Sequence, residues 1–293
     1  MKIDTHQHYW AYTAEHFPWI SADMPALQKD CVPADVAPAL QAAGVDAVLA
    51  VQARSMAAET DYLLALAQSN PRIVGVVGWT DLCAPDVADT LDGYGGQALL
   101  KGMRHILQDE PDLPSLIRSP AFSRGVRALQ QRGLVYDVLV FERQMSAVVD
   151  FCARHNTHWL VLDHVGKPAI REWQGPHASN RWLASLRALA SMPHVVCKLS
   201  GLVTETDWAR STALSPQDAS TIQECFDRAL ELFGPHRILY GSDWPVCQLA
   251  TPYEAVHGLA QRWANSRLTR HEQDAFWGGN AQRCYGLQPP NPT

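Results

Sequence analysis

Short apolar runs recur along this chain at intervals long enough to hold a helix between neighbours, and this rhythm limits the folds open to it. The runs are rich in valine, isoleucine and leucine, and most show no alternation with polar residues. Such runs are typical of parallel strands that are covered on both faces. We predict eight strands, at Lys2–His6, Asp46–Gln52, Ile73–Trp79, Ala98–Met103, Leu134–Val140, Trp159–Asp163, Val195–Leu199 and Ile238–Tyr240.

The segments between these runs have the apolar spacing of amphipathic helices. Two of them end near Gly44 and Gly133, and glycine suits the left-handed turn that closes many helices. Eight strands alternating with helices over 293 residues fit an α/β fold, the (β/α)8 TIM barrel, which takes about 250 residues. A two-domain doubly wound sheet is the rival, but no GxGxxG follows a strand and no P-loop pattern is present. We predict one barrel domain over residues 1–287, a disordered tail over 288–293, and helices at Pro33–Ala43, Thr60–Ser69, Ser119–Arg132, Met145–Asn156, Asn180–Ser191, Pro216–Phe233 and Pro252–Trp263.

Charge and composition exclude several classes of function. The net charge is −6 and no basic run is present, which argues against binding to nucleic acid or to an anionic membrane. No stretch approaches the ~18 consecutive apolar residues of a transmembrane helix. Seven cysteines are scattered without CxxC spacing, a pattern of reduced thiols. Because the first predicted strand leaves no room for a signal peptide, we expect a cytoplasmic protein. The sequence does not indicate how many copies of the chain associate.

Polar and aromatic residues gather where the predicted strands end. In a barrel the carboxyl ends of the strands meet at one mouth, so we expect the functional residues there. His6 and His8 lie two positions apart at the end of the first strand, so their side chains share a face and can ligate a metal or steer a proton. The other strand ends supply Gln52, Arg54, Trp79, Asp81, Lys101, Arg104, His105, Asp163, His164, Lys198, Ser200, Asp243 and Trp244.

Three of these segments together resemble a known family. The segments His6-Gln7-His8-Tyr9-Trp10, Asp163-His164-Val165-Gly166-Lys167-Pro168 and Gly241-Ser242-Asp243-Trp244-Pro245 are similar, in order and separation, to motifs of the amidohydrolase superfamily. More narrowly, they resemble its amidohydrolase-2 branch of sugar-lactone hydrolases, the L-fuconolactonase and L-rhamnonolactonase type. The resemblance runs from Ile3 to about Gly286 and implies a distorted barrel that opens a sugar-acid lactone with water.

The resemblance also implies roles for four residues. In metal-dependent members, the positions that match His6, His8, His164 and Asp243 are catalytic and hold one divalent ion, zinc or manganese. The aspartate at the position of Asp243 also acts as general base toward the attacking water. The fifth strand here carries no histidine, unlike that of two-metal members, so we interpret Lys101 as a substrate-binding or structural cation. Some members of this branch need no metal, so both alternatives stay open.

A sugar lactone needs hydrogen-bonding groups and one or two aromatic faces in its pocket. A dicarboxylate lactone would instead favour several arginines. Only Arg54 and Arg104 are expected at the mouth, which favours a neutral lactone. We expect the loops at Trp10–Pro25 and Trp173–Trp182 to set ring size and stereochemistry. The predicted substrate-binding residues are Gln52, Arg54, Lys101, Arg104, His105, Trp10, Trp79 and Trp244.

Other interpretations stay open. Asp243 could cap a following helix, and His164 could be a core histidine. The second functional hypothesis is a metal-dependent hydrolase or decarboxylase acting on an aromatic-derived carboxylate or a dicarboxylate lactone, and it predicts a tightly held metal. The third is a barrel that only binds a ligand. The histidines away from the strand ends are predicted to lie at the surface: His16, His155, His158, His177, His194, His236, His257 and His271.

Overall fold

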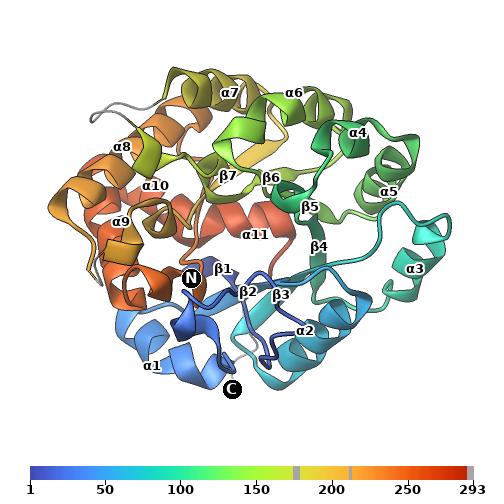
Figure 1. Ribbon diagram of the computed structural model, residues 1–293, viewed down its shortest axis with the longest axis horizontal. Coiled ribbons are helices and arrows are strands. Elements are labelled where there is room, and N and C mark those ends of the chain that lie inside the picture. The colour runs from blue at the N-terminus through green and yellow to red at the C-terminus, as the bar shows by residue number, and fades with distance from the viewer. Residues whose placement is uncertain (174–178, 211–212, 289–293) are drawn as a thin grey trace.

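The computed structural model describes residues 1–173, 179–210 and 213–288 of the chain. Eight parallel strands follow one another in sequence order, and helices surround them (Figure 1). The predicted (β/α)8 TIM barrel is confirmed. The strands are β1 (Ile3–Gln7), β2 (Ala47–Val51), β3 (Ile73–Gly78), β4 (Leu100–His105), β5 (Val135–Val138), β6 (Leu160–Leu162), β7 (Val195–Leu199) and β8 (Ile238–Tyr240).

The barrel closes where the end of β1 meets the segment after β8. Gln7 pairs with Trp244 in a parallel bridge, and the backbone N–H of His8 donates to the Trp244 carbonyl at 2.7 Å. The backbone N–H of Asp243 donates to the His6 carbonyl at 2.9 Å. This closure places the first and the last of the three motifs side by side.

Apolar side chains cover both faces of the strands, as the continuous runs predict. One cluster joins strand residues such as Leu49 and Val161 to Tyr285 and Leu287 near the end of the described chain. The last helix, α11 (Asn280–Tyr285), lies across the barrel in Figure 1, so these side chains fill its interior and cover one end. A second, larger cluster packs the outer faces of the strands against the surrounding helices.

The helices have the predicted start and stop signals. The side chain of Ser215 accepts the backbone N–H of Asp218 at the start of α8, and Pro216 occupies its first turn. Gly44 and Gly133 have φ angles of +64° and +69°, which confirms the two left-handed helix ends. The helices besides α11 are α1 (Pro33–Ala43), α2 (Ala57–Ser69), α3 (Val87–Gly93), α4 (Leu113–Arg118), α5 (Pro120–Gln131), α6 (Met145–Arg154), α7 (Asn180–Ala190), α8 (Pro216–Phe233), α9 (Tyr253–Arg267) and α10 (Arg270–Asp274).

Two of the histidines predicted at the surface are buried, and for these the prediction was wrong. His155 is 1% exposed after α6 and packs against Phe151, with ring centroids 4.6 Å apart. His257 is 8% exposed on α9 and packs against Trp277, at 5.3 Å. Both imidazoles present an apolar face to an aromatic neighbour, which helical periodicity does not reveal. His177 and the predicted tail from residue 289 onward lie outside the described residues.

All seven cysteines are free, as predicted. Among the helices of the described ranges, none combines the length and apolarity needed to cross a membrane.

Candidate active site

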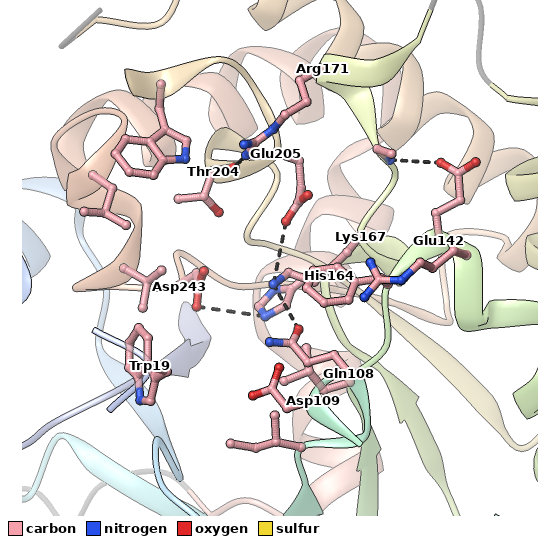
Figure 2. A pocket seen from close by; sticks show the side chains of 18 of the residues that line it. Trp19, Gln108, Asp109, Glu142, His164, Lys167, Arg171, Thr204, Glu205 and Asp243 are labelled. Carbon is pink, nitrogen blue, oxygen red and sulfur yellow. Dashed lines mark hydrogen bonds and ion pairs between the residues drawn. The ribbon is translucent and has the colours of Figure 1, made fainter. Parts of the chain in front are cut away.

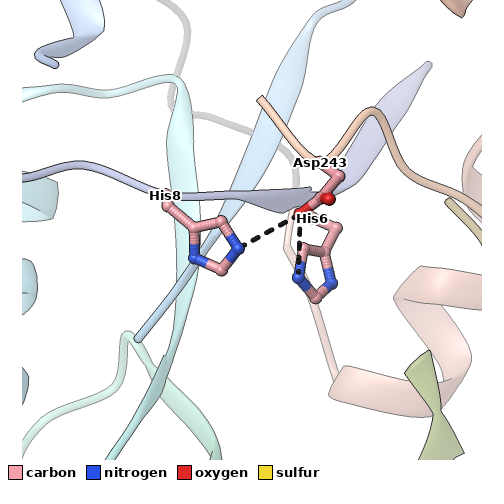
Figure 3. Close-up of side chains that lie close together, drawn as sticks. All are labelled: His6, His8 and Asp243. Carbon is pink, nitrogen blue, oxygen red and sulfur yellow. Dashed lines mark ion pairs between the residues drawn. The ribbon is translucent and has the colours of Figure 1, made fainter. Parts of the chain in front are cut away.

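Four side chains from three parts of the chain meet at the carboxyl ends of the strands. The Nε2 atoms of His8, His6 and His164 lie 3.3, 3.7 and 3.9 Å from the same carboxylate oxygen of Asp243. Figure 3 shows the first two imidazoles on either side of that carboxylate. The rings of His6 and His8 leave the strand end together, with centroids 4.9 Å apart. The structure therefore brings together the four residues to which the resemblance assigned catalysis and metal binding.

The second nitrogen of each imidazole faces a fixed partner. His8 Nδ1 donates to the carbonyl of Val51 at 2.8 Å. His164 Nδ1 lies 2.9 Å from Ser200 Oγ, and His6 Nδ1 lies 3.4 Å from the carboxylate of Asp163. Partners on the outer nitrogen orient a ring and leave Nε2 to act at the centre of the site.

The backbone at this site takes conformations that most residues avoid. His164 and Asp243 have φ angles of +55° and +62°, in the left-handed region. Gly201 leaves space for the imidazole, because a Cβ at this position would lie 2.3 Å from His164 Nδ1. A Cβ at Gly241 would lie 2.8 Å from the His6 Cβ. Unusual backbone of this kind is concentrated at functional sites, where surrounding contacts hold it in place.

Burial and charge set the protonation states of the site. Burial lowers the pKa of His164 to about 4 and lowers the pKa of His6 well below its ordinary value. Burial alone would raise the pKa of Asp243, but the neighbouring imidazoles outweigh it and lower that pKa below its usual range. At neutral pH, Asp243 is therefore an ionised carboxylate beside neutral His6 and His164.

A fully buried charge network lies beside His6. Lys198 Nζ contacts Asp137 at 2.6 Å, Asp163 at 3.2 Å and His6 Nδ1 at 3.3 Å. The hydroxyl of Tyr285 donates to the other oxygen of Asp137 at 2.8 Å. Burial raises the pKa of Asp137 to about 6 even though Lys198 opposes the rise. The network joins strands β5 and β7 to α11 and fixes the carboxylate that orients His6.

Arg104, which we predicted to bind substrate, is engaged by the protein. Its Nη1 lies 3.0 Å from Asp163 and 3.2 Å from His6 Nε2. Its Nε and Nη2 donate to the side chain and carbonyl of Gln52. A guanidinium has five N–H donors, and these contacts occupy them all. Arg104 and Gln52 therefore position the site in this arrangement.

A cavity of about 610 Å³ opens over these residues (Figure 2). Its wall includes Trp19 and Met24 from the Trp10–Pro25 loop and Arg181 from the Trp173–Trp182 loop, the two loops expected to shape it. Its charges are balanced, with five basic and six acidic residues: Arg104, Arg143, Lys167, Arg171 and Arg181 against Asp23, Asp109, Glu142, Glu172, Glu205 and Asp243.

Most of the other predicted substrate-binding residues lie outside this cavity lining. Arg54 forms an ion pair with Glu59 at 2.6 Å. His105 pairs with Glu110, also at 2.6 Å. Lys101 donates to the carbonyl of Gly286, toward the barrel end covered by the chain's last helix. Of the three tryptophans predicted to contact sugar, Trp10 and Trp244 are packed in the core, and Trp79 is half-buried outside the cavity lining.

The prediction of which arginines lie at the barrel mouth was partly wrong. Arg54 is not part of the cavity lining, whereas Arg143, Arg171 and Arg181 are. Arg181 lies in the first turn of α7, and Arg143 and Arg171 lie in short 3-10 helices within loops, whose paths the apolar pattern does not encode. The same is true of Gln108 and Glu205, which line the wall and which sequence reasoning missed. Only Lys167 carried a signal, because it lies within the second motif.

The donor atoms at the centre of the site fit one divalent ion. Three imidazole nitrogens and a carboxylate oxygen are ligands that zinc prefers, and tetrahedral ligands on bonds of about 2.0 Å are about 3.3 Å apart. In the group of His6, His8 and Asp243 the ligand atoms lie within 4.8 Å of one another, and the two Nε2 atoms lie 3.7 and 3.3 Å from the carboxylate oxygen. A second group, of His6, Asp163 and His164, is less suited, because the Asp163 oxygens already face Lys198 and Arg104. Arg104 Nη1 beside His6 Nε2 places a fixed positive charge near the first group, which opposes tight metal binding.

Comparisons with known proteins agree with this geometry. A family model described as amidohydrolase matches residues 3–287. The L-fucono-1,5-lactonase of Burkholderia multivorans is 51% identical over 99% of this chain and 97% of its own length. The L-fucono-1,5-lactonase of Burkholderia ambifaria is 31% identical over the same shares of the two chains. A crystal structure of a Burkholderia multivorans amidohydrolase with bound zinc is 51% identical, with a TM-score of 0.94 over 98% of this chain and 100% of that chain.

Proposed function

The chain belongs to the amidohydrolase family, and from this premise we propose that it hydrolyses a neutral sugar-acid lactone of the L-fuconolactone type. The observation that carries the proposal is an ionised carboxylate, Asp243, held among neutral imidazoles at the cavity wall. The identity to two L-fucono-1,5-lactonases supports the substrate class. The free cysteines fit a reducing compartment such as the cytoplasm.

Opening a lactone requires a base for the attacking water and an acid for the departing alkoxide. Asp243 takes a proton from water as the water oxygen bonds to the lactone carbonyl carbon. The ring C–O bond of the tetrahedral intermediate then breaks, and Asp243 returns the proton to the alkoxide oxygen. His8 Nδ1 is committed to the Val51 carbonyl, so only Nε2 of that ring faces Asp243 and the reacting centre.

His6, His8, His164 and Asp243 would hold a single zinc or manganese ion. When bound, such an ion supplies Lewis acidity toward the carbonyl oxygen. The protein's own contribution is to direct the Nε2 lone pairs inward through the contacts of Val51, Ser200 and Asp163.

The balanced charge of the cavity favours a neutral substrate over a dicarboxylate. A dianion would need unpaired basic groups. The donors of Arg104 are already engaged, Arg171 donates to the Thr204 carbonyl, and Arg181 lies 3.8 Å from Glu142. Polyhydroxylated neutral ligands are better matched to a wall of mixed donors and acceptors.

A pH-indicator assay of the purified protein on a panel of aldonolactones tests the proposal. We expect acid release with L-fucono- or L-rhamnono-type lactones and none with aromatic carboxylates. Activity that disappears on chelation and returns with zinc or manganese would make the four-residue donor set a working metal site. Activity that survives chelation would assign the carbonyl polarisation to the protein alone. Inactivity across the panel, together with turnover of an aromatic carboxylate, would replace the proposal with the decarboxylase or hydrolase hypothesis.

Asp243→Asn tests the base directly. Asparagine tolerates the left-handed backbone at this position, so the fold should persist. Removing a general base costs about 10²- to 10⁴-fold in kcat. Asp86→Asn, an exposed aspartate before α3, is the matched control and should keep full activity. A kcat within a few-fold of the parent protein would remove Asp243 from the mechanism.

A further inference from the structure

We propose that Lys167, Gln108 and Glu205 form a subsite that binds ring hydroxyls of the lactone and so determines specificity. This proposal rests on the proposed lactonase function and names the part of the substrate that the cavity wall recognises. The three residues come from separate segments. Lys167 follows β6, while Gln108 and Glu205 lie in the 3-10 helices Leu107–Asp109 and Val203–Glu205.

Lys167 is the centre of the subsite. Its Nζ lies 3.1 Å from Gln108 Oε1 and 3.6 Å from Glu205 Oε1, and it sits over the ring of Phe141 at 4.9 Å. Figure 2 shows the ammonium between these two polar side chains, beside His164 and the carboxylate of Asp243. The backbone is fixed on both sides, because the Lys167 N–H donates to the His164 carbonyl and its own carbonyl accepts from Glu142.

Each member of the subsite keeps unused hydrogen-bonding capacity. An ammonium has three donors, and the two contacts within the described residues use two of them. Gln108 accepts from Lys167 through Oε1, so its amide N–H groups are available to the cavity. Glu205 faces Lys167 with one oxygen, Oε1, and its other oxygen can accept a hydrogen bond from a ligand.

The side chain of Glu205 is also largely buried, at 12% exposure. Burial raises its pKa, and the nearby Lys167 and Arg171 oppose the rise. A carboxylate that has lost most of its water and whose contact with Lys167 is 3.6 Å long gains from a hydroxyl that donates to it.

Donors and an acceptor side by side match the chemistry of neighbouring hydroxyls on a sugar ring. One hydroxyl oxygen can accept from Lys167 or Gln108 while its neighbour donates to Glu205. Because Lys167 lies only three residues after His164, the subsite adjoins the reacting centre, where it can hold the ring of a lactone whose carbonyl faces Asp243. It therefore predicts a preference for polyhydroxylated lactones over unsubstituted ones of the same ring size.

The test compares kcat/KM for two six-membered lactones, L-fucono-1,5-lactone and an unsubstituted δ-lactone, in the full-length protein. A hydrogen bond to a charged group is worth about 10- to 100-fold. We expect Lys167→Met to lower kcat/KM for the hydroxylated lactone by about this factor, mostly through KM, and to change the unsubstituted lactone by only a few-fold. Glu205→Gln, which keeps the shape but removes the charge, should give the same pattern to a smaller extent. Lys29→Met, an exposed lysine outside the cavity lining, should change neither.

The outcomes separate the two proposals. If the parent protein hydrolyses neither lactone, both the lactonase proposal and the subsite proposal are overturned. If the parent is active but Lys167→Met lowers both substrates equally, the lysine serves catalysis or structure and the subsite proposal is overturned. If Lys167→Met does not fold, Glu205→Gln decides between the same two results, because an unchanged preference in that variant also overturns the proposal.

Discussion

Lys198 and Lys167 lie at the same end of the barrel, pair with carboxylates and differ in one respect. Lys198 is fully buried, and its Nζ lies 2.6 Å from Asp137, 3.2 Å from Asp163 and 3.3 Å from His6 Nδ1. Lys167 is part of the cavity wall, with one close polar partner and a carboxylate at 3.6 Å. A saturated charge cluster fixes the structure, whereas an unsaturated one can still bind a ligand.

The difference shows how the same residue types support two tasks. One network holds His6 in place, and its charged groups contact one another instead of a substrate: Lys198, Asp137, Asp163 and Arg104. The subsite around Lys167 leaves donors and an acceptor open toward the cavity. We therefore expect substitutions in the first to affect stability and substitutions in the second to affect substrate preference.

The largest expected effect is on the stability of Lys198→Met. Removing the cation leaves the buried Asp137 without its ion-pair partner and Asp163 with Arg104 alone, and breaking a buried pair costs about 3–5 kcal/mol of unfolding free energy. Lys167→Met should change the same quantity by about 0.5 kcal/mol or less. Urea unfolding followed by circular dichroism measures both. Equal losses in the two variants would erase the distinction between the clusters.

Tyr285→Phe sharpens the comparison within the saturated network. It removes one hydrogen bond to the buried Asp137 carboxylate, and we expect a loss of about 1.5–3 kcal/mol in unfolding free energy. The matched control is Tyr94→Phe, since the hydroxyl of Tyr94 donates at 3.1 Å to Asp61 near the surface. If Tyr285→Phe lowers the unfolding free energy no more than the control does, the network tolerates an Asp137 oxygen without its hydrogen-bond donor.

Ser200→Ala tests a site residue with a single partner. His164 Nδ1 has Ser200 Oγ at 2.9 Å, and the loss of such a contact lowers metal affinity by about 10- to 100-fold. Zinc titration by calorimetry measures the change without reference to activity. Ser191→Ala, on the exposed end of α7, is the control. Unchanged zinc affinity would show that Ser200 does not orient the ring.

The last prediction concerns the pH dependence of stability and lies away from both clusters. Among the described residues, neither ring nitrogen of the buried His155 has a partner, and burial lowers its pKa from 6.5 to about 4. Between these pH values His155 is protonated in the unfolded chain but neutral in the folded chain. The free energy of unfolding therefore falls as the pH drops from 6.5 to 4. In His155→Phe this part of the pH dependence should disappear. Unfolding measured at several pH values checks it, and parallel curves for the two proteins would contradict it.

Periodicity was enough to locate the barrel because every strand is covered on both faces. It did not reveal α3, α4, α10 and α11, which are short and begin without a long amphipathic repeat. The four residues proposed to act in catalysis could be predicted because they lie within motifs at strand ends that resemble those of the family: His6, His8, His164 and Asp243. The roles assigned to those residues stay proposals until the assays above are done.

The incorrect predictions at the site have two physical origins: a misplaced strand end, and contacts between segments that lie far apart in the sequence. The predicted fourth strand ended at Met103, whereas β4 continues to His105. Lys101 lies four residues before the true strand end, which is ~13 Å of strand, so it is not at the mouth but toward the opposite end beside Gly286. Gln108 and Glu205 were missed because loop paths depend on tertiary contacts such as the one with Lys167. The saturation of Arg104 depends on Gln52 and Asp163 together, and a one-dimensional pattern does not contain it.

The junction of β1 with the segment after β8 also determines when a newly made chain can become an enzyme. His6 and His8 leave the ribosome well before Asp243, which follows only after seven further strands. A nascent chain that stops short of Asp243 has imidazoles without the carboxylate that they surround, and its strands β1 and β7 keep open edges that invite pairing with other chains. The site can therefore act only after the last strand and Asp243 have been made. Incomplete products of translation should be inactive and prone to aggregation.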